Sequence, residues 1–421
     1  MGVPDPGVDE GAGAVTTVPL RHAVHINSDV LPESTPSDFS FRYIDISQVT
    51  STGDVQVPVE PTIFGEAPSR ARRIARPGDT VVSTVRTYLR AIAAVPESAD
   101  PLVFSTGFAV LRSKTLDAGF LTYACRSEPF IDEVVARSVG VSYPAINLSD
   151  LLDLRIPSPP LEQQRRIADF LDDRVSRINR IIAARREQVD LVRSIPWLDF
   201  SAALGSIPTI PLRRGIATLV DGPFGSAYSS ADYVDSGPAV IRLGNIGFAD
   251  FRDTDLARVT NSLYERFPQA HVRPGDLLIA SLGDARNHAG RACLVPPGLG
   301  PAMVKGKCFR ARANPKVAST EFLAVLLSSP RGADALVQQG TGSTRSMLNF
   351  ERLLSSRVPI PSRAEQEGAV DSFRSNRDHS AGTEAALTHS ISLLAEYRTS
   401  LITAAVTGDL DVTTAGSNIP E

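Results

Sequence analysis

The sequence predicts an α/β fold of two repeated globular α/β domains, separated by two long antiparallel coiled-coil helices and related by a pseudo-two-fold. Three observations lead to this prediction. Segments of the first half recur in order in the second half, a proline-rich joint closes each copy, and a long helical stretch follows each joint. A period near 200 residues is far too long for a solenoid, so it indicates two copies of one domain.

The repeat rests on short matches whose offset stays between 197 and 203 residues. The matched pairs are NLSDLLDLRIP (147–157) with NFERLLSSRVP (349–359), FLTYACRS (120–127) with FLAVLLSS (322–329), RPGD (76–79) with RPGD (273–276), FRYIDI (41–46) with IRLGNI (241–246), and LEQQRRIADFL (161–171) with AEQEGAVDSFR (364–374). Matches that keep their order at a nearly constant offset are hard to attribute to chance.

Each copy mixes strands and helices. An RPGD turn precedes the strand candidates TVVSTV (80–85) and LLIAS (277–281), and the helix candidates lie at 118–137 and 319–339. The joints read IPSPP (156–160) and VPIPS (358–362). Proline cannot continue a preceding helix but is tolerated before a new one, so each joint should lead into a helix.

Two long helices are predicted from apolar residues spaced alternately by four and three. The first is free of Pro and Gly from Leu161 to Ser194, and we expect Pro196 to stop it; the second runs from about Arg363 to Val406. The stripe residues are Ile167, Leu171, Ile178, Ile181, Val192 and Ile195 in the first, and Val370, Phe373, Leu387, Ile391, Leu394, Leu401 and Ala405 in the second. Such stripes favour an antiparallel pair, although each helix could instead pack on its own domain.

The resulting division has six parts. We expect a disordered N-terminal segment (1–16), a first domain (17–157), a central long helix (158–204), a second domain (205–361), a distal long helix (362–407) and a C-terminal tail (408–421).

Composition and short motifs narrow the classes of function. The 421 residues are 42% hydrophobic and 21% charged, with no apolar run of membrane-spanning length, no secretory signal and three cysteines without metal spacing. We therefore expect a non-membrane protein of the cytoplasm. The sequence has no phosphate loop, no HExxH and no nucleophile elbow, and it lacks the Asn/Asp-Pro-Pro-Tyr/Phe motif of amino-methyltransferases. We expect no catalytic or metal residues and no cofactor in this chain.

Positive charge gathers locally although the net charge is −4. Residues 69–90 hold six arginines against Asp79, and residues 266–316 hold nine basic side chains against two aspartates. Local basic clusters are typical of phosphate contact, though each could also be a solvated face without a partner.

Four patterns remain to be explained: PPLEQQRRIADFLD (159–172), DGPFGSAY (221–228) with VIRLGNI (240–246), FRYIDIS (41–47) and LLAEYRTSLITAAVTGDLDV (393–412). Together they resemble a known family, the DNA specificity subunits of type I restriction-modification systems. The first domain has no recognisable equivalent of DGPFGS, and the distal joint RAEQEGAVDSF is weaker than the central one.

The resemblance implies that each globular copy is a target recognition domain for one half of a bipartite site on double-stranded DNA. It implies that the helices set the spacing of the half-sites and dock two methyltransferase subunits. Those partners would bind S-adenosylmethionine, and a restriction or translocase subunit could join them. A coiled-coil scaffold that presents two protein-binding domains, without reading DNA sequence, is the alternative.

Candidate reading residues follow from the repeated loops and from base chemistry. Arginine can bind guanine with two hydrogen bonds, Asn can bind adenine in the same way, and hydroxyl groups serve either base or phosphate. The candidates are Arg42, Ser83, Arg86, Tyr88, Arg90 and Tyr143 in the first copy, and Arg242, Asn245, Ser281, Arg286, Asn287, Arg291 and Arg345 in the second. Each could instead make a bond internal to the fold or a phosphate contact without sequence information.

Overall fold

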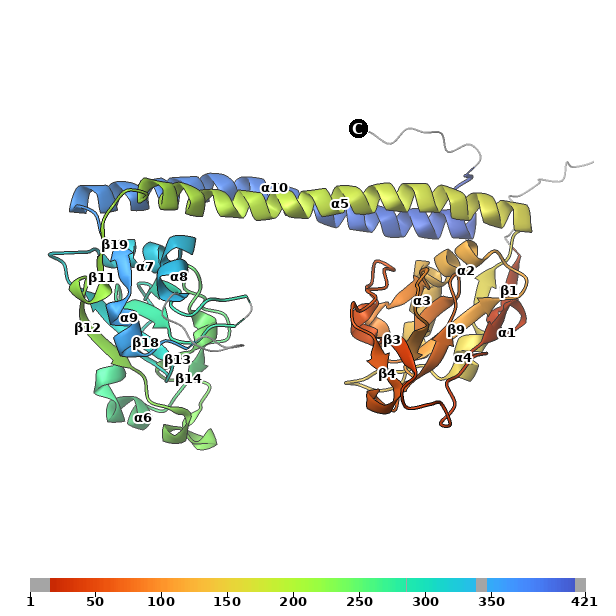
Figure 1. The fold of residues 1–421 in the computed structure, drawn as a ribbon, viewed down its shortest axis with the longest axis horizontal. Coiled ribbons are helices and arrows are strands. Elements are labelled where there is room, and N and C mark those ends of the chain that lie inside the picture. The colour runs from red at the N-terminus through yellow and green to blue at the C-terminus, as the bar shows by residue number, and fades with distance from the viewer. Residues whose placement is uncertain (1–15, 285, 338–346, 413–421) are drawn as a thin grey trace, which may run out of the picture. The chain divides into compact units, whose positions relative to one another are not determined.

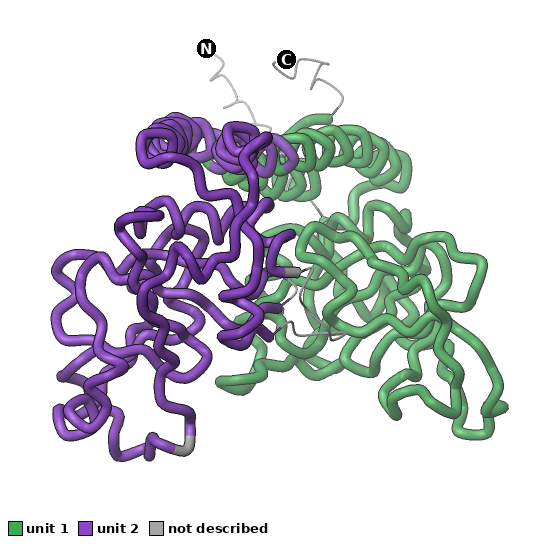
Figure 2. Tube along the Cα trace, turned by 60° about the vertical axis from the view of Figure 1, so that its left-hand side comes forward, with its two compact units in different colours: residues 1–186, 389–421 green, residues 187–388 purple. Residues whose placement is uncertain are grey.

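The computed structural model describes residues 16–284, 286–337 and 347–412. The chain forms two compact units, the first from residues 1–186 with 389–421 and the second from residues 187–388 (Figure 2). The disordered N-terminal segment expected at 1–16 and the end of the C-terminal tail fall almost wholly outside the described residues. The α/β class and the duplication are confirmed, as the sheets of the two units make plain.

The first unit holds two four-stranded sheets and a two-stranded ribbon, β1-β10. The sheet β2-β9-β6-β7 is antiparallel, and the sheet β4-β3-β8-β5 contains the parallel pair β3-β8 (Figure 1). The strands are β1 (Thr17–Pro19), β2 (Val24–Ile26), β3 (Ser40–Ile44), β4 (Thr62–Ile63), β5 (Ala71–Ala75), β6 (Thr80–Ser83), β7 (Ile92–Ala94), β8 (Leu102–Ser105), β9 (Phe108–Ser113) and β10 (Arg155–Pro157). The short helices are α1 (Leu20–Ala23), α2 (Ala118–Cys125), α3 (Glu128–Ala136) and α4 (Leu148–Asp153).

The second unit repeats this plan. Its ribbon is β11-β19, its antiparallel sheet is β12-β18-β15-β16, and the sheet β14-β13-β17 again contains a parallel pair, β13-β17. The strands are β11 (Thr209–Pro211), β12 (Ile216–Asp221), β13 (Ala239–Ile241), β14 (Ala257–Arg258), β15 (Leu277–Ala280), β16 (Ala292–Leu294), β17 (Ala302–Val304), β18 (Cys308–Ala313) and β19 (Arg357–Pro359). The short helices are α6 (Asn261–Arg266), α7 (Thr320–Ser328), α8 (Pro330–Val337) and α9 (Phe350–Ser355).

The repeated RPGD is a turn that leads into a buried strand, as predicted. The carboxylates of Asp79 and Asp276 accept hydrogen bonds from the backbone N–H of Arg76 (2.9 Å) and Arg273 (3.0 Å). Gly78 and Gly275 both have φ of +84°, a conformation that glycine adopts without steric cost. The strands β6 and β15 follow directly.

The single helices expected at 118–137 and 319–339 are wrong, because each is two helices. α2 ends before Ser127, the N-cap of α3, whose second residue is Pro129. In the second unit Ser329 separates α7 from α8, which begins at Pro330. A proline has no N–H to continue the hydrogen bonds of the preceding helix, so it starts a new helix instead.

A buried glutamine fixes each long helix to its own domain. Gln164 accepts a hydrogen bond from the N–H of Asp117 (2.8 Å) and donates one to the carbonyl of Pro159 (2.7 Å). Gln366 does the same with Ser319 (2.9 Å) and Pro361 (2.9 Å). The two glutamines are therefore equivalent at an offset of 202, and the offset of 203 expected for this segment is wrong by one residue.

Removing either glutamine should weaken the attachment of its helix. We expect Gln164→Ala to cost about 2 kcal/mol, because a buried donor and acceptor lose their partner. Gln366→Ala should cost more, since Gln366 also donates to the carbonyl of Val317 (2.9 Å). Urea unfolding would measure both. Gln163→Ala, at the exposed neighbouring position, is the control and should change little; an equal loss there would contradict the assignment.

The long helices are α5 (Leu161–Ala203) and α10 (Arg363–Thr407). In the first unit the start of α5 packs with the end of α10, through Leu171 and Ile178 with Leu401 and Ala405. In the second unit the end of α5 packs with the start of α10, through Phe200 with Phe373. Within each unit the helices thus contact both each other and the adjoining domain.

Two details of the first stripe are wrong. Pro196 does not stop α5, which continues to Ala203 while Trp197 and Phe200 pack against Phe373. Ile181 and Ile195 are exposed, and the buried residues near the first of them are Ile178 and Ile182. The buried residues Ala168, Leu171, Val175, Ile178, Ile182 and Val189 still follow a repeat of three and four residues, as in a coiled coil, but the stripe passes through Ile182 instead of Ile181.

Candidate nucleic-acid interface

In the first unit two loops are joined into one surface. They are residues 85–90, after β6, and residues 138–145, after α3; we call them the paired loops. Backbone bonds link Arg86 N–H to the carbonyl of Pro144 (2.7 Å) and close a small hairpin between Val139 and Ala145 (2.9 and 3.0 Å). The hydroxyls of Thr87 and Ser138 lie 2.8 Å apart. The loops are therefore held together by bonds that do not depend on a ligand.

Four candidate readers project from the paired loops. The guanidinium of Arg86 lies 4.8 Å from the ring centre of Tyr143, which is 65% exposed, and Tyr88 is 56% exposed. Arg90 is ion-paired with Glu128 (2.6 Å) at the edge of this surface. The structure thus brings Arg86, Tyr88 and Arg90 together with Tyr143, which lies more than 50 residues further along the chain.

The other two candidates of the first unit are engaged inside the fold. Arg42 pairs with Asp100 (2.7 Å) and donates to the carbonyls of Pro58 (3.0 Å) and Val59. Ser83 is buried in β6, and its hydroxyl donates to the carbonyl of Val85 (2.5 Å). Both side chains support neighbouring loops in this state, and a role in contacting bases stays a prediction.

The described residues of the second unit repeat part of this arrangement. Leu282 forms an antiparallel β-bridge with Met347, as Val85 does with Ala145. The N–H of Leu348 donates a hydrogen bond to the carbonyl of Ser281 (2.8 Å). Ser281 itself is buried and donates to the carbonyl of Lys307 (3.0 Å). Arg345, the candidate expected on this second loop, lies outside the described residues.

Arg291 is a framework residue of this surface. Its side chain is 4% exposed and donates to four carbonyls, those of Ile246 (2.8 Å), Leu243 (3.0 Å), His288 (3.1 Å) and Leu282 (3.2 Å). Burial lowers the pKa of the guanidinium from its usual value. Arg291 therefore ties the loop after β15 to the turn after β13, and it has little surface with which to reach a base.

The turn after β13 uses two more candidates for its own structure. Asn245 is 2% exposed; it accepts from Arg242 N–H (2.9 Å) and donates to the carbonyl of Arg252 (2.9 Å). The guanidinium of Arg242 pairs with Asp255 (2.9 Å) and lines an open cavity of 530 Å³ with Lys305. Arg242 remains reachable from solvent, whereas Asn245 does not.

Arg286 and Asn287 lie on the loop itself. The backbone N–H groups of both bond the carboxylate of Asp284 (2.8 and 2.9 Å), and the Asn287 amide also donates to it (3.1 Å). The Arg286 side chain is exposed and makes no hydrogen bond or ion pair within the described residues. Among the described candidates of the second unit, Arg286 is the one whose side chain is most free to contact a ligand.

Several surface residues escaped the sequence-based search because they are apolar or aromatic. Val139 and Val141 at the tip of the paired loops are 80% and 102% exposed. In the second unit, Tyr228 and Tyr233 stack, and Lys305 lies 5.0 and 5.6 Å from their ring centres. For Val139 and Val141, the sequence signal that could have indicated an exposed apolar loop was their position on either side of Gly140.

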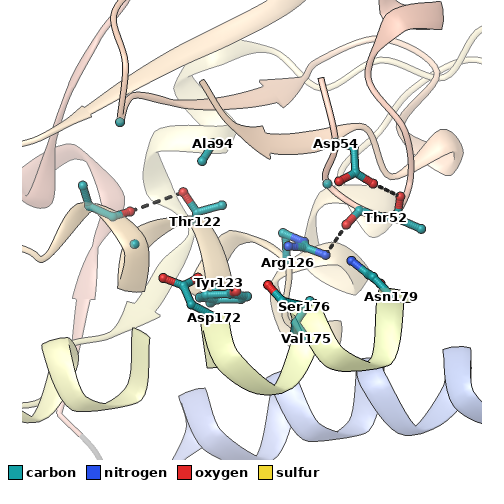
Figure 3. Close-up of a pocket in the computed structure, with 14 residues that line it drawn as sticks. Thr52, Asp54, Ala94, Thr122, Tyr123, Arg126, Asp172, Val175, Ser176 and Asn179 are labelled. Atoms are coloured by element: carbon teal, nitrogen blue, oxygen red, sulfur yellow. Dashed lines mark hydrogen bonds between the residues drawn. The ribbon is translucent and has the colours of Figure 1, made fainter. Parts of the chain in front are cut away.

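A polar cavity of 320 Å³ lies in the first unit between the domain and α5 (Figure 3). Arg126 reaches into it and donates to the carbonyl of Thr52 (2.5 Å), while Tyr123 donates to Asp172 of α5 (2.7 Å). Burial lowers the pKa of Arg126. Gly53, with φ of +86°, leaves room for the guanidinium, because a Cβ there would lie 2.6 Å from it. The cavity belongs to the joint between domain and helix.

The described residues hold neither a metal-binding cluster nor a membrane-spanning helix. No three His, Cys, Asp or Glu side chains there converge on a point that could hold a metal ion. No helix within the same ranges is long and apolar enough to cross a membrane.

Comparison with known proteins finds a matching family domain. Residues 62–191 match the family described as the type I restriction modification DNA specificity domain. This part of the chain is similar to that family. The matched residues run from β4 through both of the paired loops and into α5. The expected resemblance to type I specificity subunits is confirmed.

Two curated specificity subunits are similar over part of their length. The chain is 19% identical over 280 residues to the type I restriction enzyme MjaVIII specificity subunit of Methanocaldococcus jannaschii, a match that covers 63% of this chain and 64% of the relative. It is 24% identical over 270 residues to the type I restriction enzyme EcoBI specificity subunit of Escherichia coli, with 57% and 55% covered. The matches thus span less than two thirds of either specificity subunit.

A solved structure shares the fold of this chain. It comes from work on the structural basis of complex assembly and conformational transition of the type I R-M system, and it aligns with a TM-score of 0.67 at 23% identity. The alignment covers 95% of this chain and 99% of that chain.

Proposed function

We propose that the chain is the DNA sequence-specificity subunit of a type I restriction-modification complex, and that its two domains bind the halves of an asymmetric bipartite DNA site. One observation carries the proposal. In both units the loop after the RPGD strand forms a β-bridge to a later segment, Val85 with Ala145 and Leu282 with Met347, yet the accessible arginines on this loop differ, with Arg86 in one unit and Arg286 in the other. Equivalent frames with different contact residues suit the reading of two different half-sites.

We further propose that the long helices dock two methyltransferase subunits. Both helices carry exposed large apolar side chains. Soluble monomeric proteins rarely expose several such side chains side by side on one helix face. Leu191, Ile195 and Leu198 follow each other at helical spacing on α5 in the second unit, and Leu393 and Tyr397 do so on α10 in the first. Partners that cover these residues would bring S-adenosylmethionine and the methylation chemistry, and a translocase-nuclease subunit would add restriction. This chain would be non-catalytic and act on DNA in the cytoplasm.

A methylome tests the proposal. Single-molecule sequencing would map 6-methyladenine in the native strain and in a strain that lacks this gene. We expect one bipartite motif to lose its methylation on deletion, which would give both half-sites and the spacer at once. An unchanged methylome in a strain that expresses the complex would contradict the proposal and favour a scaffold without DNA readout.

The length of the helices should set the spacer of the recognised motif. Seven residues added to α5 after Arg186, with seven added to α10 before His389, lengthen each helix by about 10 Å. At 3.4 Å per base pair we expect the spacer to grow by about three base pairs, while both half-sites stay the same. The methylome of the variant strain gives the result directly. An unchanged spacer, or a changed half-site, would argue against helices that measure distance.

A further inference from the structure

The paired loops of the first unit present a compact apolar surface. Val139, Val141 and Tyr143 at the hairpin tip are 80%, 102% and 65% exposed, and Tyr88 and Leu89 from the neighbouring loop are 56% and 38% exposed. Single exposed apolar side chains need no explanation, but several on two adjoining loops indicate a surface that meets a partner.

The backbone holds this surface in place at a cost. Arg86 and Arg90 have φ of +51° and +53°, a left-handed conformation that is unfavourable for residues other than glycine. Gly140 has φ of +117°, and a Cβ there would lie 3.0 Å from the carbonyl oxygen of Tyr143. Strained backbone of this kind persists where the surrounding structure enforces it, and it clusters at binding sites.

Positive charge borders the apolar tip. Arg86 lies over the ring of Tyr143, and both line a cavity of 350 Å³ together with the ion pair of Arg70 and Asp45 (2.6 Å). The segment 69–90 that supplies these arginines contains one acidic residue, Asp79, which is 4% exposed and paired with Arg112. An apolar tip with cations beside it complements a groove of duplex DNA, where apolar methyl groups lie between two rows of phosphates.

We propose that the hairpin tip reads its half-site by contact with thymine methyl groups in the major groove, with Val141 and Tyr143 as the contact residues. The inference rests on the proposed function and deepens it. The C5 methyl of thymine is the apolar group that the major groove presents, and aliphatic or aromatic side chains are its natural contacts. Arg86, held on Tyr143, is placed to donate to a phosphate or guanine next to the contacted thymine.

Uracil substitution isolates the methyl group, because uracil differs from thymine by that group alone. Once the methylome has given the motif, the full chain with its methyltransferase partners is titrated with duplexes in which each thymine of both half-sites is replaced singly by uracil. We expect about fourfold weaker binding at each contacted thymine, from the loss of one buried methyl group. Uracil in the spacer serves as the control on the DNA.

The variant Val141→Ser should bind the thymine and uracil duplexes equally well at the position that it contacts. Val141 is fully exposed, so this change should leave the fold intact. Val59→Ser, at a valine that is 90% exposed on a different loop of the same unit, is the matched control and should keep the fourfold preference for thymine.

The outcomes separate this proposal from the proposed function. Specific binding with no sensitivity to uracil, or a sensitivity that Val141→Ser leaves unchanged, would each overturn the thymine contact, while the specificity function would stand. Loss of subunit assembly in Val141→Ser, measured by size-exclusion chromatography, would assign the tip to a protein partner and overturn it too. Absence of any sequence-specific binding by the complex would contradict the proposed function itself.

Discussion

Arg291→Met is expected to destabilise the second unit by about 3 kcal/mol or more and to abolish recognition of one half-site. The change leaves four backbone carbonyls without their donor in a buried place, and each unpaired group carries a desolvation cost. The loop after β15 then loses its connection to the turn after β13, so the exposed Arg286 on that loop loses its fixed position.

Chemical denaturation, followed by circular dichroism, measures the stability of the variant, and binding to half-site duplexes measures recognition. Arg286→Met is the matched control, since it removes the same group from the same loop at an exposed position. We expect it to weaken DNA binding with stability within about 0.5 kcal/mol of the original protein. A stable Arg291→Met variant with weakened binding would instead make Arg291 a direct reader.

Phe373→Ala is expected to cost about 3–5 kcal/mol, because it empties the centre of an aromatic cluster. Phe373 is 2% exposed, and its ring lies 4.6 Å from that of Trp197 and 6.0 Å from that of Phe200, which contacts Phe322 of α7 at 5.9 Å. The cluster joins α5, α10 and the domain within the second unit, so the loss should detach both helices from it.

Calorimetry can show where this loss falls. If the two units unfold in separate steps, the transition of the second unit should move to lower temperature and that of the first should stay. Phe224→Ala removes the same side chain from a position in the second unit that is 58% exposed, and it should change the transition little. A comparable shift in both variants would mean that the cluster does not hold the unit together.

The duplication and its landmarks were predictable from the sequence because they depend on local signals. The RPGD turn requires a carboxylate three residues after Arg76 and a glycine at positive φ. Asp79 and Gly78 meet these requirements, and both can be read directly from the sequence. The same holds for the proline joints. The positions of Arg86 and Tyr143 on matching loops also followed from the repeat, and the structure brings the two side chains within 4.8 Å.

The roles of polar residues in the same loops were not predictable, because they depend on which carbonyls lie nearby. Arg291 and Arg286 have the same chemistry and are five residues apart, yet one is buried among carbonyls and the other is exposed. Asn245 fits the pattern of an adenine contact, but its amide satisfies a local turn instead. Base chemistry alone ranks such residues equally, and burial separates them.

The division of the helices between the units has a consequence for synthesis on the ribosome. Residues 187–388 form the second unit as one continuous piece, so that unit has all its residues once position 388 has emerged. The first unit, although it begins earlier, needs Leu401, Ile402, Ala405 and Val406 to cover Leu171 and Ile178. Its core stays open until position 406 has emerged. A premature stop codon shortly after position 388 should therefore damage the half of the protein that was made first.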